Sequence, residues 1–138
     1  MEIDLAVWAR RTSASPAGLV QHARQRITGL GGRTAAAGIR LESAFDPAQL
    51  TAREETALLS LLADFPSVVA VAGRAAEPHR VARYLESAAA AWSGCDEACP
   101  VLPRRGRPEP DLARARLTLA QAAGTVLASG LSLLGVPD

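Results

Sequence analysis

The chain has 138 residues, of which 49% are apolar and only 4% aromatic, and its formal net charge is +1. This length predicts a single domain over residues 1–138, large enough for a core of its own. The small net charge excludes a protein drawn to nucleic acid or membrane by overall charge alone. Two cysteines and no apolar signal segment at the N-terminus fit a reducing compartment, so we expect a cytoplasmic protein.

The first confident helix follows a lead-in segment, residues 1–14, that is either extended or a short helix. Ser15 and Pro16 have the order of an N-cap and a first-turn proline, and Gly31-Gly32 is expected to end the helix. Helical spacing predicts five inward apolar residues: Leu19, Val20, Ala23, Ile27 and Leu30. Residues 33–47 show only a weak helical pattern.

Three signals mark the helices of the middle of the chain. Thr51 and Glu54 have the spacing of a capping box, Pro66 opens the next helix, and Glu77-Pro78 opens another. The helix after Pro78 should turn five residues inward: Val81, Tyr84, Leu85, Ala88 and Trp92. Residues 94–110 contain both cysteines and four of the nine prolines, which predicts a loop.

A long last helix is predicted at 111–134, with Asp111 as N-cap and a stop at Gly135. Apolar residues surround its narrow polar stripe, so the helix, including Val126, should be buried at the centre of an all-α bundle of about five helices. The stripe comprises Arg114, Thr118, Gln121, Thr125, Ser129 and Ser132. The uncharged stretch 117–137 is long enough to cross a bilayer, but its polar residues favour a buried helix, and no membrane contact is expected.

Four segments carry motifs that, in this order, resemble one known family. They are IDLAV at 3–7, SPAGLVQHARQRI at 15–27, FPSVV at 65–69 with EPHRVARYLESAAAAW at 77–92, and ARLTLAQAAGTVLASGLSLLGVPD at 115–138. They resemble segments of the DALR domain, the C-terminal anticodon-binding domain of class I arginyl-tRNA synthetases. In the family these segments read, in the same order, FDL-type, NPxYYVQYAHARI, FPxVV…EPHRLxRYLxDLAxAF and ARLxLxxATxxVLxNGLxLLGI. The resemblance implies an all-α anticodon-binding fold and tRNA as partner.

The catalytic half of such a synthetase has no counterpart in the sequence. Its His-x-Gly-His signature is absent, since the two histidines, His22 and His79, lie far apart. The sequence therefore predicts a stand-alone, noncatalytic domain that uses no cofactor and no small-molecule substrate.

The resemblance also implies that the anticodon contacts are eroded. Tyrosines of the family's YYVQY segment approach the anticodon loop, and Gly18, Leu19 and His22 take their places in this chain. Asp96 stands where another tyrosine is expected. Stacking of a base on an aromatic ring contributes about 1–3 kcal/mol, so tRNA binding is expected to be weak.

Six polar residues remain as predicted RNA contacts: Gln21, His22, Arg24, Arg26, Arg80 and Arg83. Each has a plainer reading, because a helical arginine is often solvated and Arg80 and Arg83 have helical spacing to Glu77 and Glu86. A basic stripe joining these residues would favour RNA. An exposed apolar patch would favour the alternative, a protein-interaction or dimerisation module that kept the fold but lost RNA binding.

The two cysteines, Cys95 and Cys99, lie one helical turn apart if this segment is helical. A zinc site needs two more ligands, and none is near in the sequence, so no metal is expected. Cys99 matches a cysteine common in the family and is interpreted as a packing thiol. No catalytic triad or carboxylate pair stands out.

Overall fold

All regular structure in the part of the chain described by the computed structural model, residues 5–9, 15–41 and 46–136, is helical. The elements are α1 (Leu5–Trp8), α2 (Pro16–Ala36), the 3₁₀ turn η1 (Pro47–Gln49), α3 (Arg53–Ala63), α4 (Phe65–Ala75), α5 (His79–Ala98) and α6 (Pro110–Leu133). This confirms the all-α prediction. The lead-in is helical at Leu5–Trp8, while Ile3 and Asp4 of the IDLAV motif lie outside the described residues.

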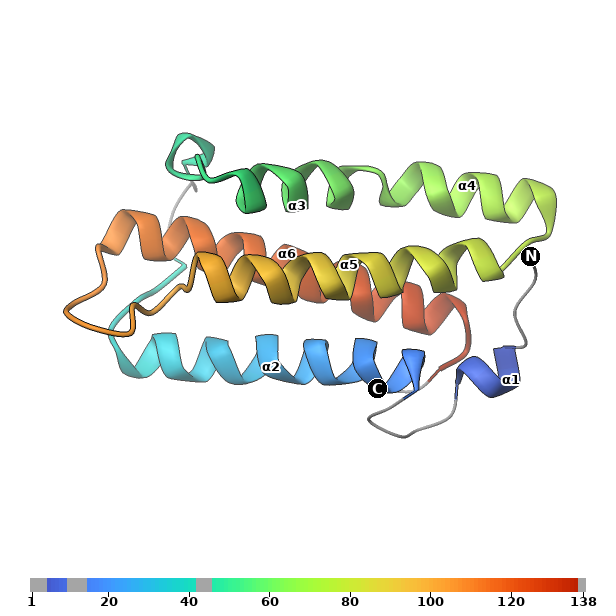
Figure 1. Cartoon of the computed structure of the whole chain (residues 1–138), viewed down its shortest axis with the longest axis horizontal. Coiled ribbons are helices and arrows are strands. Elements are labelled where there is room, and N and C mark those ends of the chain that lie inside the picture. The colour runs from blue at the N-terminus through green and yellow to red at the C-terminus, as the bar shows by residue number, and fades with distance from the viewer. Residues whose placement is uncertain (1–4, 10–14, 42–45, 137–138) are drawn as a thin grey trace.

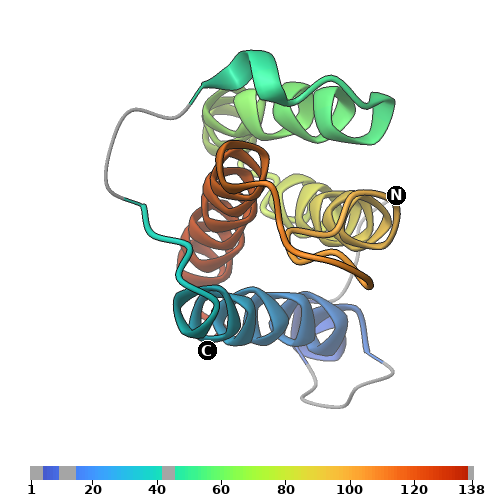
Figure 2. The same cartoon turned by 90° about the vertical axis from the view of Figure 1, so that its left-hand side faces the viewer.

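The helices form four long rods that lie side by side (Figure 1). One rod consists of α3 and α4, which follow each other end to end with only Asp64 between them. The α5 and α6 rods occupy the middle, with α2 on one side and α3–α4 on the other (Figure 2). The expected bundle of about five helices is thus five longer helices arranged as four rods.

The centre of the bundle is shared by two helices. α5 packs against α2, α3, α4 and α6, and its five predicted inward residues are all buried. α6 lies against α2, α3, α5 and η1, as its wide apolar face predicted. The two helices approach closely at Gly130, where an added Cβ would stand 2.4 Å from the Leu85 Cδ2. Only a glycine at this position permits that approach.

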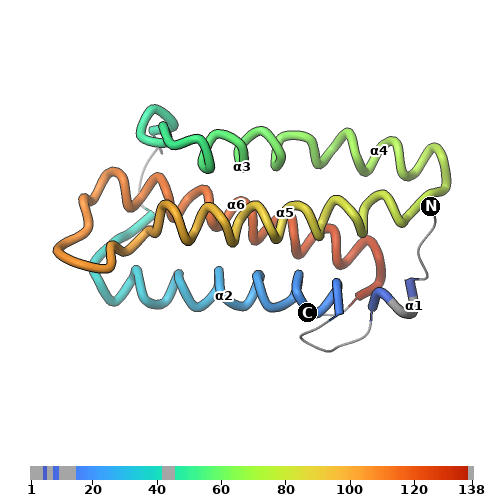
Figure 3. Tube along the Cα trace, viewed as in Figure 1, coloured from blue at the N-terminus to red at the C-terminus, as the bar shows by residue number. Residues whose placement is uncertain are grey.

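Two helices run further than the sequence predicted. α2 continues through Gly31 and Gly32 to Ala36 because Leu30 and Thr34 are buried on one face, and the helix stops before Gly38, whose φ is +83°. α5 continues to Ala98, since Cys95 extends its buried face by another turn. The predicted loop 94–110 is therefore shorter, 99–109, and it joins α5 to α6 at the end of the bundle where α2 ends (Figure 3).

The helix starts also differ from the predicted caps. At α3 the backbone N–H of Ala52 donates to the Glu55 carboxylate at 3.1 Å, so the contact is one residue later than the expected Thr51–Glu54 box. At α6 the Glu109 carboxylate, rather than Asp111, accepts from the first backbone N–H groups, at 3.1 and 3.3 Å. Pro110 then occupies the first turn.

Two apolar residues lie off the buried faces to which they were assigned. Leu19 is 56% exposed, because the buried stripe of α2 passes through Val20 instead. Val126 is half-buried, and its neighbour Leu127 is fully enclosed. The end of the α6 polar stripe is exposed as predicted, at Gln121, Thr125, Ser129 and Ser132.

Among the described residues, one helical stretch, Arg53–Ala75, is long and apolar enough to cross a membrane by length and composition alone. It corresponds to the α3–α4 rod, which packs on α5 with one side only. It is a different stretch from residues 117–137.

Candidate nucleic-acid interface

Arg26 lies in a three-residue cluster between α2 and α5. Its Nη2 is 2.8 Å from the Asp96 Oδ2, and its guanidinium carbon lies 4.9 Å from the ring centroid of Trp92. The Arg26 side chain is still 42% exposed. The predicted RNA contact is thus a partly exposed charge that lies over an indole ring and is paired with a carboxylate.

The energy of this cluster is small, but its geometry is defined. An exposed ion pair contributes about 0–1 kcal/mol and an exposed cation–π contact about 0.5–1 kcal/mol. Asp96 stands where the family resemblance led us to expect a tyrosine, and in this chain it partly neutralises the nearest arginine. A phosphate approaching Arg26 therefore meets competition from Asp96.

The other predicted residues of α2 face different surroundings. Arg24 lines a groove of about 510 Å³ between α2 and α6, together with Gln121 and Ser129 of the polar stripe. Arg26 lines a separate groove, on the α5 side of the same helix. Gln21 is half-buried and His22 is exposed.

Arg80 and Arg83 border a third groove, of about 560 Å³, at the outer face of α5 beside α3 and α4. The Arg80 Nε is 2.8 Å from the Glu77 carboxylate, which is the pairing that the helical spacing of the two residues allowed. The floor of the groove is largely apolar and includes Leu61, Val68, Val71 and Tyr84.

The six predicted contacts therefore do not form one site. The arginines among them line three separate grooves, one with Arg24, one with Arg26 and one with Arg80 and Arg83. The third groove is instead an exposed apolar patch, where Val71 is 38% exposed.

A buried ion pair at one end of the bundle was not predicted. Glu55 of α3 is 1% exposed, and its carboxylate accepts from the Arg116 Nε at 2.8 Å. Arg116 also donates through Nη1 to the Pro100 carbonyl oxygen at 3.2 Å, so it links α3, α6 and the segment after α5. The only sequence signal is an arginine between the buried residues Ala115 and Leu117 of α6.

The two thiols of α5 are buried and unpaired. Burial raises the pKa of Cys95 to about 12 and also raises the pKa of Cys99, so both thiols are protonated near neutral pH. In residues 5–9, 15–41 and 46–136 no group of three or more His, Cys, Asp and Glu side chains could hold a metal ion.

The all-α bundle is the fold that the sequence resemblance led us to expect, and the comparison with known families identifies the class of domain. Residues 20–138 match the DALR anticodon binding domain, and the chain belongs to this family.

Three similar proteins share one name. Proteins named "Arginine--tRNA ligase" match over 100% of this chain at 49% identity in Kineococcus radiotolerans, and over 99% at 44% in Clavibacter sepedonicus and 43% in Micrococcus luteus. The chain covers 24–25% of their lengths, so it spans about a quarter of these relatives. No solved structure matches.

Proposed function

We propose that this chain is a noncatalytic tRNA-binding domain that contacts the anticodon region of arginine tRNA weakly and with little selectivity for its bases. Membership of the family supports arginine tRNA as the partner, because the matching domain is an anticodon-binding one and the relatives are named for arginine and tRNA. The extent of the match supports the noncatalytic role, because the chain corresponds to about a quarter of these relatives and residues 20–138 match the anticodon-binding domain.

The observation that carries the weak selectivity is the Asp96–Arg26 pair. Bases are held by stacking on aromatic rings or guanidinium planes, and they are read at their edges. Where the family resemblance predicts tyrosines, this chain has Asp96, an exposed aliphatic Leu19 and a buried Gly18. The contacts that are left go to phosphate, together with stacking on the Arg26 guanidinium, and both hold an RNA without reading the edges of its bases.

The test is a titration of arginine tRNA and of an anticodon-swapped version at low and moderate salt. We expect both tRNAs to bind alike, and binding to fade between about 50 and 200 mM salt, as counterion release requires. Arg26→Ala should weaken both tRNAs equally. Tight binding at the higher salt that depends on the anticodon would contradict the proposal.

A gain-of-function variant sharpens this test. Leu19→Tyr places an aromatic ring at an exposed family contact position and should tighten tRNA binding about tenfold, which is the lower part of the range for one stacked base. Leu133→Tyr is the matched control, because Leu133 is 59% exposed on α6 and matches no family contact. Equal effects of the two variants would show that α2 does not face the RNA.

The proposed lack of catalytic activity is tested by a separate measurement. The chain mixed with ATP, arginine and tRNA should form no aminoacyl-tRNA and support no arginine-dependent pyrophosphate exchange. Turnover by the pure chain would refute this part of the proposal.

The second candidate is a protein-interaction or dimerisation module, which the apolar groove beside α4 favours. On this reading the chain self-associates or binds a partner protein, and Val71→Ser weakens that association. Sedimentation across a range of concentrations would detect a dimer. A chain that binds no tRNA at any salt but self-associates would support this alternative.

A further inference from the structure

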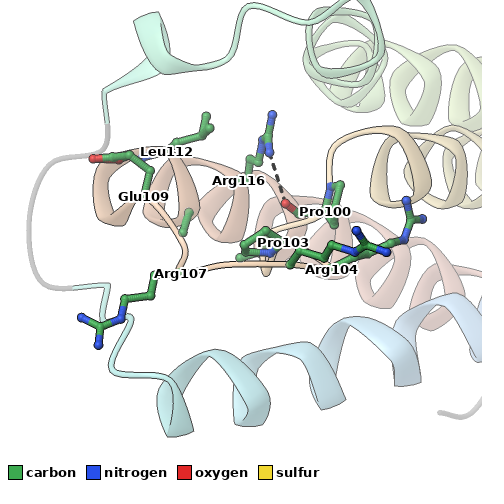
Figure 4. A pocket seen from close by; sticks show the side chains of 10 residues that line it. Pro100, Pro103, Arg104, Arg107, Glu109, Leu112 and Arg116 are labelled. Carbon is green, nitrogen blue, oxygen red and sulfur yellow. Dashed lines mark hydrogen bonds between the residues drawn. The ribbon is translucent and has the colours of Figure 1, made fainter.

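The segment 99–109 between α5 and α6 places arginines beside two grooves that the predicted contacts do not explain. One groove, of about 520 Å³, lies between the segment and the start of α6 (Figure 4). The other, of about 410 Å³, lies against α2 and the end of α5. We call the two together the loop grooves. Their charged lining is six arginines and three carboxylates: Arg26, Arg33, Arg104, Arg105, Arg107, Arg116, Asp96, Glu97 and Glu109.

Most of this negative charge is already engaged. Asp96 is paired with Arg26, and the Glu109 carboxylate accepts from the first N–H groups of α6. Within the described residues, four of the arginines form no ion pair with a carboxylate, and all four are exposed: Arg33, Arg104, Arg105 and Arg107. The chain as a whole carries only +1, so this surface concentrates positive charge.

The arginines stand on a segment that the fold holds in place. Val101 is 5% exposed, the Pro100 carbonyl oxygen accepts from Arg116 at 3.2 Å, and Arg104 donates to the Glu97 carbonyl oxygen at 3.3 Å. Gly106, with φ of +81°, turns the chain between the last two arginines. Figure 4 shows Arg104 and Arg107 extending to opposite sides of the segment. An anchored segment loses little conformational entropy when it binds a ligand.

We propose that the loop grooves bind the phosphodiester backbone of an RNA strand through Arg33, Arg104, Arg105 and Arg107. The proposal rests on the proposed function and extends its contact surface beyond the six residues predicted from the sequence. Guanidinium groups bind phosphate oxygens through paired N–H donors.

A second feature of the same surface favours RNA over an acidic protein. The Arg26 guanidinium, held on Trp92, is a flat cationic plane beside the α2-side groove. Bases of single strands stack on such planes while the backbone follows positive charge. A peptide rich in glutamate uses the charge but has no flat base to place on the plane.

The test compares two double variants of exposed arginines. Arg105→Gln/Arg107→Gln removes two of the proposed phosphate contacts and leaves Arg104, which contacts the backbone of α5. Arg53→Gln/Arg74→Gln is the control on the α3–α4 rod, with the same change in net charge. Both proteins are titrated with arginine tRNA and with a short oligouridylate over a salt series, and their thermal unfolding is compared with that of the wild type.

We expect the loop variant to bind both RNAs at least tenfold more weakly at low salt. The slope of log K against log salt should become shallower by about 1.5, as expected for two lost phosphate contacts, while the control keeps the wild-type slope. If the wild type binds oligouridylate but not tRNA, and the loop variant binds oligouridylate at least tenfold more weakly, the proposed function is overturned but RNA binding in the loop grooves is supported. Three outcomes would overturn the proposal that the loop grooves bind RNA. The two variants could bind RNA equally well, the wild type could bind neither RNA, or polyglutamate of equal charge could displace the RNA.

Discussion

The two ends of the α5–α6 pair are held together by different kinds of contact. At the end where α5 passes into α6, a buried carboxylate on α3 binds Arg116, and Arg116 binds the Pro100 carbonyl oxygen. At the other end the two helices touch directly, with Leu85 against Gly130 and without an intervening polar group. The first end also carries the exposed arginines of the loop 99–109, whereas at the second end α4 packs on α5 beside the exposed Arg80 and Arg83.

The contacts at one end mainly stabilise the bundle, whereas those at the other end also fix the position of the loop 99–109. Close apolar packing stabilises a bundle without fixing any exposed segment. A buried ion pair adds little net stability, but its partners have one geometry, and here that geometry includes the backbone of residue 100. We therefore expect damage at the polar end to change both folding and RNA contact, and damage at the apolar end to change folding alone.

The largest effect is expected from Arg116→Met. The change leaves the Glu55 carboxylate buried without its partner, which should lower the free energy of unfolding by about 3 kcal/mol or more. Urea denaturation at neutral pH measures this loss. The double variant Glu55→Met/Arg116→Met should recover most of the stability but not the position of the loop. A single variant as stable as the wild type would show that the pair is solvated.

A matched pair of glycine substitutions tests the apolar end. Gly130→Ala forces a Cβ against Leu85 and should lower stability by about 1–3 kcal/mol, less any gain in helix propensity. Gly94→Ala, in α5 with no atom within 4 Å of the new Cβ, should raise it by about 0.5–1 kcal/mol. Thermal melts of the two proteins should therefore shift in opposite directions. Shifts of the same sign would mean that α5 and α6 do not approach closely at Gly130.

The smallest loss of stability is expected at Tyr84, which is next to Leu85 at the apolar end. Its hydroxyl donates to the Leu61 carbonyl oxygen at 2.6 Å, and Tyr84→Phe should cost about 1 kcal/mol.

Alkaline pH gives the same bond a second readout. Burial, and then the charge of Asp64, raise the pKa of Tyr84 to about 12, so the unfolded chain loses this proton at lower pH than the folded one. The stability that Tyr84 contributes should therefore fall as pH rises from about 10 to 12, and the phenylalanine variant should lack this fall. Tyr84 is the only tyrosine, so its tyrosinate absorbance can be followed directly. A normal titration near pH 10 would contradict the buried bond.

The helices and the core of α5 were predictable because they depend on local periodicity. Val81, Leu85 and Trp92 follow the helical repeat, and all three are buried. The same repeat extends to Cys95 and Cys99, so it also indicates the true end of α5. The loop was predicted too early because of the prolines that follow. The predicted end of α2 at Gly31-Gly32 was wrong for a different reason. Burial of Thr34 by neighbouring helices overrides the local preference of these glycines for a helix end.

The candidate site was less predictable because it depends on contacts between distant residues. Arg26 was found through the resemblance, but its ion pair joins residues 70 positions apart, and the Glu55–Arg116 pair joins residues 61 apart. No local pattern encodes such pairings. The arginines at 104, 105 and 107 were visible as a basic cluster between prolines, and a search for basic clusters would have singled them out.

The turn at Gly106 has a consequence for the covalent chain. Arg104 and Arg105 are exposed outside any helix, whereas Pro108 follows Arg107 and blocks cleavage there by a protease specific for arginine. Exposed loop tips are preferred sites of nicking even where the loop is anchored at its base, so we expect trypsin to cut this loop after Arg104 or Arg105. Both pieces would keep their helices, because α6 lies whole on one side of the cut and packs against α2, α3 and α5. We therefore expect a long fragment and a synthetic α6 peptide to reassemble into the domain, which would open that helix to chemical labelling.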